Sequence, residues 1–249
     1  MNNFFGIQAL IFVFGLIAGS FLNCLIYRLP KGIKVSKGRS RCTFCGENLK
    51  AIHLIPILSY LAQRGKCSFC KSKIPLRYLI VELALPLLWV YGFLTWGLSA
   101  YFLYFALISF FIVGLFFTDL EKYVLPDKLM LPAIFVAFLW HVIQERSFHS
   151  LFWGVIVGAG FFAIQYWISK GKWVGEGDIW FGALMGIMFG FPQVLISIWI
   201  AYVMGGIVGF TLLISKKKNL NSKIPFGTFL AVSSLIMFFY GRYLPIIWQ

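Results

Sequence analysis

The chain has 249 residues, of which 60% are hydrophobic and only 12% are charged. Soluble globular domains usually carry about 25% charged residues, so this composition excludes an ordinary soluble domain and predicts a membrane protein. Its 22 Lys and Arg residues outnumber its 8 Asp and Glu residues, giving a formal net charge of +14. The basic residues fall mainly in alternate loops, which favours membrane topology over nucleic-acid binding.

Apolar residues form eight long runs along the chain. They cover residues 4–27, 78–96, 100–118, 128–143, 151–169, 173–191, 194–214 and 225–241. Most approach the ~20 residues that a helix needs to cross a bilayer, and open backbone cannot cross lipid. The sequence therefore predicts an all-α membrane protein with about eight transmembrane helices. The first run lacks the basic start of a secretory signal peptide, so we expect it to be a retained span.

Loop charges predict the orientation of these spans. The loop 28–77 holds 12 basic residues, and further basic residues lie at 119–128, 170–172 and 216–223. The loops between them carry little positive charge. Because basic loops stay in the cytoplasm, we expect the 28–77 loop to be cytoplasmic and both termini to be extracytoplasmic.

Small residues recur at helical spacing in two of the runs. Gly154 and Gly158 form one such pattern, and Gly182, Gly186 and Gly190 form another. Glycines four residues apart let helix backbones approach closely in lipid. We expect these positions to pack helices together.

Five of the eight acidic residues lie in two short stretches, 118–127 and 175–178. Asp119 closes the third run, and Asp178 lies near the start of the sixth. The predicted topology places both at the cytoplasmic face, which a paired-carboxylate site requires. Carboxylates at membrane depth are costly and usually functional.

The sixth run predicts where Asp178 lies relative to the bilayer. To reach ~20 residues, its helix must begin near Trp173, which would place Asp178 about 7 Å inside the boundary. A partly desolvated carboxylate beside a second one can share a proton with it. One member of such a pair takes a proton from water while the other polarises a carbonyl.

Simpler interpretations of these acidic residues remain open. Asp127 follows a proline and is typical of a helix N-cap, whereas Glu121 is typical of a solvated loop charge. Asp178 is compatible with helix capping alone, and Asp119 with snorkelling to the interface. The glycines at 175 and 177, which flank Glu176, favour the catalytic interpretation because they let backbone and substrate approach Asp178.

Four cysteines in the 28–77 loop form two CxxC pairs. Cys42 with Cys45, and Cys67 with Cys70, have the spacing of a tetrahedral zinc site. Four thiolates leave no open position for water, so we expect a structural role. Two disulfides or a redox CxxC are the alternatives, and the expected cytoplasmic location disfavours disulfides. Cys24 lies in the first run and is typical of a packing residue.

Several motifs together resemble the bacterial prepilin peptidases, which are membrane aspartyl peptidases of the GxGD type. They are Asp119 with Leu125-Pro126-Asp127, Gly175-Glu176-Gly177-Asp178, the stretch Gly19 to Pro30, Arg77 to Glu82, and Pro225-Phe226-Gly227. They follow the family's order over almost the whole chain. The resemblance implies that Asp119 and Asp178 are catalytic, with Glu121, Asp127, Gly175, Glu176 and Gly177 nearby.

The same resemblance implies a second activity. Many family members carry the cysteine tetrad and methylate the new N-terminus of the cleaved pilin, using S-adenosylmethionine. The polar residues that bracket the loop are candidates for that cofactor: Asn23, Arg28, Arg77 and Glu82.

The sequence thus predicts a division into a first span (1–27), a zinc-binding cytoplasmic loop associated with methyl transfer (28–77), and a seven-span peptidase bundle (78–249). We expect a multi-pass protein of the bacterial cytoplasmic membrane, with prepilin or pseudopilin substrates entering from the bilayer and no nucleic-acid partner. The alternatives are another intramembrane GxGD protease, a carrier, or a non-catalytic zinc-anchored assembly protein.

Overall fold

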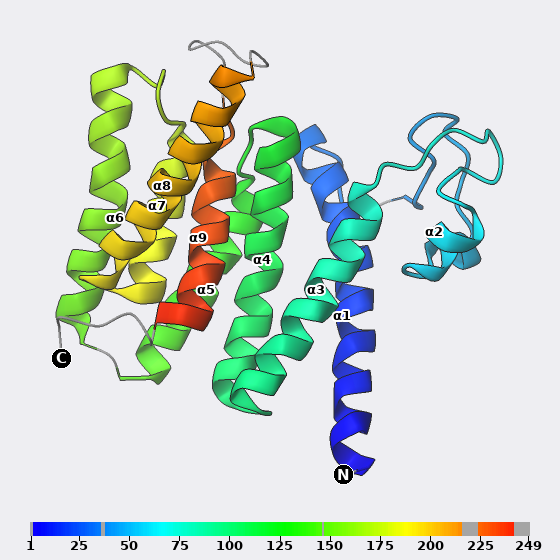
Figure 1. Cartoon of the computed structure of the whole chain (residues 1–249), viewed down its shortest axis with the longest axis horizontal. Coiled ribbons are helices and arrows are strands. Elements are labelled where there is room, and N and C mark those ends of the chain that lie inside the picture. Colours follow the sequence, from blue (N-terminus) through cyan, green and yellow to red (C-terminus); the bar gives the residue numbers. More distant parts are fainter. Residues whose placement is uncertain (1, 36–37, 146, 216–223, 242–249) are drawn as a thin grey trace. The chain divides into compact units, whose positions relative to one another are not determined.

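The computed structural model describes residues 2–35, 38–145, 147–215 and 224–241. Within these ranges the chain is helical, without strands, and each predicted apolar run forms one helix (Figure 1). These helices are α1 (Asn2–Arg28), α3 (Arg77–Trp96), α4 (Ala100–Lys122), α5 (Asp127–Ile143), α6 (Phe148–Ser169), α7 (Glu176–Phe189), α8 (Gln193–Ile214) and α9 (Phe226–Tyr240). The predicted all-α class is confirmed. The basic residues predicted at 216–223 lie outside the described residues.

Five helices in the described part are long and apolar enough to cross a membrane: α1, α3, α4, α6 and α8. Helices α5, α7 and α9 have 17, 14 and 15 residues. At 1.5 Å per residue, α7 is only about 21 Å long, less than the ~30 Å hydrocarbon core. The chain is therefore a multi-pass membrane protein, and the count of eight spans stays a prediction.

The chain divides into two compact units, Met1–Gly114 and Leu115–Gln249, with the division inside α4. In the first unit, α1 packs along α3. The contact is close because α1 presents Gly15 to Pro86 and Gly19 to the backbone of Glu82. The loop between α1 and α3 contains the short helix α2 (Leu58–Ala62) and two 3-10 turns, Leu29–Lys31 and Ala51–Leu54.

In the second unit, α6 packs extensively on α7, and α8 packs on α9 (Figure 1). Glycines make the α6–α7 contact possible. A Cβ atom on Gly158 would collide with the carbonyl oxygen of Gly182, and the reverse is also true. Gly154 and Gly186 form a second reciprocal pair. The predicted packing role of these glycines is confirmed.

Two predicted helix starts are wrong. Helix α7 begins at Glu176 and not near Trp173, which lies exposed in the preceding turn. The cause is local: Lys170 and Gly171 take left-handed conformations that end α6, and Asp178 caps the backbone at Gly175. Asp127 is not an N-cap, because extended Pro126 occupies that position and α5 begins at Asp127.

Candidate active site, metal centre and ligand cavity

Asp119 lies in the last turn of α4 and is only 6% exposed. Its Oδ2 atom accepts a hydrogen bond of 2.9 Å from the backbone N–H of Thr228, and the N–H of Gly227 is a further donor. Both donors belong to the first turn of α9, whose N–H groups have no partners within the helix. The start of α9 therefore holds Asp119 by its free backbone donors and its positive dipole end.

Asp178 is likewise 6% exposed and lies in the first turn of α7. Its Oδ2 atom accepts a 2.8 Å hydrogen bond from the backbone N–H of Gly175. Asp178 thus caps its own helix, as the simpler interpretation expected. It also lies close enough to Asp119 for the two carboxylates to interact electrostatically. Two buried carboxylates from different helices therefore lie near each other in the second unit.

Leu125 joins three of the predicted motif segments. A Cβ atom added to Gly177 would lie 3.0 Å from the Leu125 side chain, and one added to Gly227 would lie 3.1 Å from it. The leucine side chain thus packs against both glycines, beside the two aspartates. Gly177 and Gly227 are required by this close packing, whereas a Cβ atom on Gly175 would make only ordinary contact with Asp178, at 3.7 Å.

The other acidic candidates differ from the aspartate pair in their exposure. Glu121, Asp127 and Glu176 are all exposed, although Glu121 and Glu176 each lie two residues from one of the aspartates in the chain. Burial therefore separates Asp119 and Asp178 from their acidic neighbours. The exposed carboxylates contribute negative charge to the surface around these segments.

Tyr202 of α8 connects further elements to this site. Its hydroxyl donates a 2.7 Å hydrogen bond to Oε1 of Gln165 in α6, and its ring packs against Phe226 with centroids 4.8 Å apart. The hydroxyl also interacts electrostatically with Asp178. Neither Tyr202 nor Gln165 was predicted, because a tyrosine and a glutamine in apolar runs carry no spacing signal.

The four predicted cysteines come together in the first unit. The Sγ atoms of Cys42, Cys45, Cys67 and Cys70 all lie within 4.8 Å of one another, and those of Cys42 and Cys70 are 3.9 Å apart. A tetrahedral ion with Zn–S bonds of about 2.3 Å would require sulfur separations near 3.8 Å. The cluster therefore fits a metal ion with four thiolate ligands.

The two CxxC segments are structural repeats, 25 residues apart. The backbone N–H of Gly46 bonds to Cys42 O, and that of Lys71 bonds to Cys67 O, each at 3.0 Å. Gly46 and Lys71 occupy equivalent positions and both have positive φ, at 72° and 58°. The isolated bridges Arg41–Asn48 and Lys66–Lys73 also correspond. Each repeat forms one tight turn that presents two sulfurs.

The hydroxyl of Ser72 lowers the pKa of the Cys70 thiol to about 6, which favours the thiolate form that binds metals.

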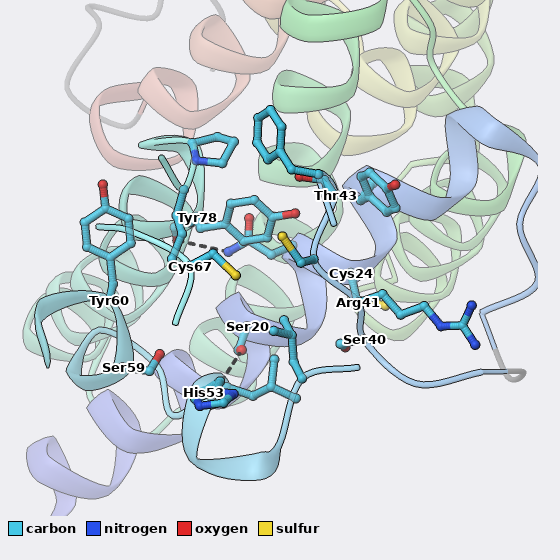
Figure 2. A pocket seen from close by; sticks show the side chains of 18 of the residues that line it. Ser20, Cys24, Ser40, Arg41, Thr43, His53, Ser59, Tyr60, Cys67 and Tyr78 are labelled. Atoms are coloured by element: carbon cyan, nitrogen blue, oxygen red, sulfur yellow. Dashed lines mark hydrogen bonds between the residues drawn. The ribbon is translucent and has the colours of Figure 1, made fainter. Parts of the chain in front are cut away.

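A cavity of about 520 Å³ adjoins the cysteine cluster. Figure 2 shows side chains from the α1 end (Ser20, Cys24), the loop (Thr43, His53, Cys67) and the start of α3 (Tyr78) that line it. This volume is in the range of small-molecule binding sites. Of the four residues predicted to bind the methyl donor, three line the cavity: Asn23, Arg28 and Glu82. Arg77 is not among the described lining residues.

The four candidates hold different positions in this region. The guanidinium of Arg28 donates to four loop carbonyl groups, those of Lys34, Val35, Gly38 and Arg39, and so organises the cavity wall. Nδ2 of Asn23 donates to Tyr78 O at 2.9 Å, while its Oδ1 has no partner among the described residues. The Arg77 guanidinium lies over the Tyr78 ring, 4.5 Å from its centroid. An orphaned buried acceptor beside a cavity is what a ligand with hydrogen-bond donors would satisfy.

Sequence reasoning missed the backbone donors to the acidic side chains. These are Gly227 and Thr228 for Asp119 and Ile57 for Glu82. Every residue except proline has a backbone N–H donor, so the residue type does not indicate which N–H groups bind a side chain. The glycine in Pro225-Phe226-Gly227 was the one available indication for the first of these contacts.

Comparisons with known proteins agree with these features. The family model for the bacterial peptidase A24 N-terminal domain matches residues 13–96, and that for the type IV leader peptidase family matches residues 105–210. The relatives include three that are named prepilin leader peptidase/N-methyltransferase. The one from Stutzerimonas stutzeri is 31% identical over 92% of this chain and 89% of the relative, and the one from Aeromonas hydrophila is 32% identical over 94% of this chain and 90% of the relative. The one from Bacillus subtilis is 28% identical over 94% of each chain. No solved structure matches the chain.

A helical membrane scaffold with a buried carboxylate pair and matches to both peptidase models defines the class as membrane peptidases. Within that class the chain belongs to the type IV leader peptidase family, and it matches the prepilin leader peptidase/N-methyltransferases over nearly its whole length. The family predicted from the motifs is thereby confirmed.

Proposed function

We propose that this protein cleaves the leader peptide of type IV prepilins or pseudopilins, with Asp119 and Asp178 as its catalytic pair. The observation that supports this most directly is that two buried carboxylates, one from α4 and one from α7, lie near enough to interact electrostatically. Family membership supplies the reaction class, and the relatives' names supply the substrate class.

In the proposed reaction, the ionised carboxylate takes a proton from a water molecule, which attacks the scissile carbonyl carbon. The protonated carboxylate donates a hydrogen bond to the carbonyl oxygen as negative charge develops there. A proton then passes to the leaving amine nitrogen as the peptide bond breaks. The donors at the start of α9 keep Asp119 in one orientation throughout.

Substrate orientation follows from the proposed topology. With the basic loops in the cytoplasm, the aspartate pair faces the cytoplasmic side of the bacterial inner membrane and both termini are extracytoplasmic. A prepilin with a basic leader and an apolar helix enters laterally from the bilayer. The exposed carboxylates of Glu121, Asp127 and Glu176 then offer charge partners to the basic leader. Reversing their charge is expected to raise the KM for cleavage; unchanged kinetics would oppose this assignment.

The catalytic pair is tested by Asp119→Asn and Asp178→Asn in purified full-length enzyme with a prepilin. Each substitution is expected to abolish cleavage while preserving the thermal midpoint and the metal content. Glu145→Gln is the matched control, because it likewise converts a carboxylate to an amide, at an exposed residue with no proposed role in cleavage or leader binding. Substantial cleavage by either buried-site variant would refute the pair.

We further propose that the loop 28–77 supports N-methylation of the new N-terminus and that its cavity binds S-adenosylmethionine. When bound, this donor supplies an electrophilic methyl group. Asn23 and Glu82 would contact it from the cavity wall, Arg28 would keep the wall in place, and Arg77 would act from outside the cavity by supporting Tyr78. The remaining segment, 78–249, forms the peptidase bundle in this division.

The ion proposed for the cysteine cluster is Zn²⁺ in a structural role. Four thiolates complete a tetrahedral shell and leave no position for a reacting water. Elemental analysis of purified protein is expected to give about one zinc per chain. A zinc content near zero with four titratable thiols would exclude the assignment.

A further inference from the structure

Glu82 is a buried carboxylate in the wall of the cavity. It lies in the second turn of α3, is 8% exposed, and lines the cavity beside the cysteine cluster. Among the described residues, no Lys or Arg side chain forms an ion pair with it. Burying an unpaired charge costs several kcal/mol, so such a group is usually paired with a ligand or a metal when the protein functions.

The surrounding backbone fixes the position of this carboxylate. Gly19 of α1 allows the backbone at Glu82 to come close, since a Cβ atom there would lie 3.0 Å from Glu82 Cα. The backbone N–H of Ile57 donates a 2.8 Å hydrogen bond to Oε2, and the Ser20 hydroxyl is a further partner. The α1–α3 contact and the loop thus hold Glu82 from two sides.

Ile57 makes its contact in a strained conformation. Its φ and ψ are 62° and −54°, and Leu58 N–H bonds to Pro56 O across it at 2.6 Å. This is a classical γ-turn, which is rare and unfavourable for a β-branched residue. Strain of this kind persists where the surrounding structure imposes it, often at ligand sites. The loop therefore adopts an unfavourable turn whose N–H points to one oxygen of Glu82.

The other charged residues of the cavity have the opposite sign. Arg39, Arg41 and Lys73 line it as exposed side chains, and Arg28 lines it as a buried side chain whose guanidinium is bonded to loop carbonyl groups. Asn23 adds an acceptor, Oδ1, that has no partner among the described residues. Carboxylate and amide oxygens are acceptors only, so the group that fits beside them is a donor with positive charge.

We propose that Glu82 is the counter-ion for an ammonium group bound in this cavity, with Asn23 Oδ1 as a second acceptor. The inference rests on the proposed methyl transfer, in which two partners carry such a group. One is the amino-acid end of the methyl donor, and the other is the new N-terminus of the cleaved substrate. In the second case the ammonium group held by Glu82 first loses a proton to water. The neutral nitrogen then attacks the methyl carbon, the carbon–sulfur bond breaks, and its electron pair stays on the sulfur of the departing S-adenosylhomocysteine.

The test is Glu82→Gln, which keeps an oxygen for the Ile57 N–H but removes the charge. Glu47→Gln is the matched control, because Glu47 is an exposed carboxylate in the same loop. Binding of S-adenosylmethionine and S-adenosylhomocysteine is measured on full-length, zinc-loaded protein. Methyl-transfer rates are measured against a synthetic mature pilin peptide with a free N-terminus, so that leader cleavage is not needed.

If Glu82 makes a charge-assisted contact, Glu82→Gln is expected to weaken binding of the ammonium-bearing partner by about 10- to 100-fold. The control is expected to leave binding unchanged. Weaker binding of both nucleosides identifies the donor's ammonium group. Unchanged nucleoside binding with a raised KM for the peptide identifies the substrate's N-terminus. Either result supports the proposal.

Other outcomes overturn it. Weaker binding of S-adenosylmethionine alone would show that Glu82 recognises the sulfonium charge. Unchanged nucleoside binding and peptide KM would show that Glu82 does not contact the ammonium group. A joint loss of zinc and leader cleavage would show that Glu82 serves only to hold Ile57 and the loop in place. If the wild-type protein neither binds the donor nor methylates the peptide, the proposed methyl transfer fails and this inference fails with it.

Discussion

Gly227→Ala tests the link between α9 and the aspartate pair with the smallest possible change. A Cβ atom at this position would lie 2.9 Å from Asp119 Oδ2, 3.1 Å from its Cγ and 3.1 Å from Leu125 Cδ2. Ordinary contacts begin at about 3.4 Å, so the carboxylate must move by roughly 0.5 Å or α9 must shift. Either movement strains the 2.9 Å hydrogen bond from Thr228.

The expected magnitude follows from that bond. A hydrogen bond to a charged group contributes about 1.5–3 kcal/mol, and each 1.36 kcal/mol corresponds to tenfold in rate. Gly227→Ala should therefore lower kcat/KM for leader cleavage by about 10- to 100-fold. Because alanine is the better helix former by up to about 1 kcal/mol, helix propensity alone would not explain a loss of activity.

The assay is cleavage of a purified prepilin by full-length enzyme, with the thermal midpoint recorded in parallel. Gly206→Ala in α8 and Gly160→Ala in α6 are matched controls, since a Cβ atom at either position meets nothing within 4 Å. Cleavage at the wild-type rate by Gly227→Ala would refute the proposed role of α9 in holding Asp119.

Other substitutions separate packing, catalysis and metal binding. Gly177→Ala should reduce cleavage more than Gly175→Ala, because only the first brings a Cβ atom to 3.0 Å from Leu125; equal losses in kcat/KM would contradict this. Gly182→Ala should destabilise the α6–α7 contact by about 1–3 kcal/mol through overpacking, measured as a lower thermal midpoint. Cys67→Ser should release zinc, whereas Cys24→Ser should retain it; elemental analysis distinguishes the two.

The helices could be predicted because long apolar runs leave few alternatives in lipid. Their ends could not, because one or two local contacts decide where a helix begins. Asp178 accepts a hydrogen bond from the backbone N–H of Gly175, and α7 begins at Glu176. A helix that began at Trp173 would come closer to the length of a membrane span. Membrane-span length was therefore the wrong criterion for this helix, and capping was the right one.

In the candidate sites too, some features could be predicted from the sequence and others could not. The cysteine cluster was predictable because metal ligands must be particular residue types at particular spacing, and the two repeats keep both. Topology and motif order predicted that Asp119 and Asp178 lie near each other, and the structure agrees; their catalytic role stays a prediction. The contacts that hold Asp119 and Glu82 were not, since their donors are backbone N–H groups of Thr228 and Ile57.

Both aspartates are held by backbone N–H groups at the start of a helix. Asp178 accepts an N–H at the start of its own helix, α7, whereas Asp119 accepts N–H groups at the start of a distant one, α9. Helix starts provide free donors without any polar side chain, which suits a site surrounded by apolar residues. The cost is steric, because carboxylate and helix start must come close. Gly227 meets that requirement beside Asp119, and Gly177 meets it beside Leu125. Gly177 and Gly227 are therefore explained by contacts with neighbouring side chains, and not by backbone flexibility.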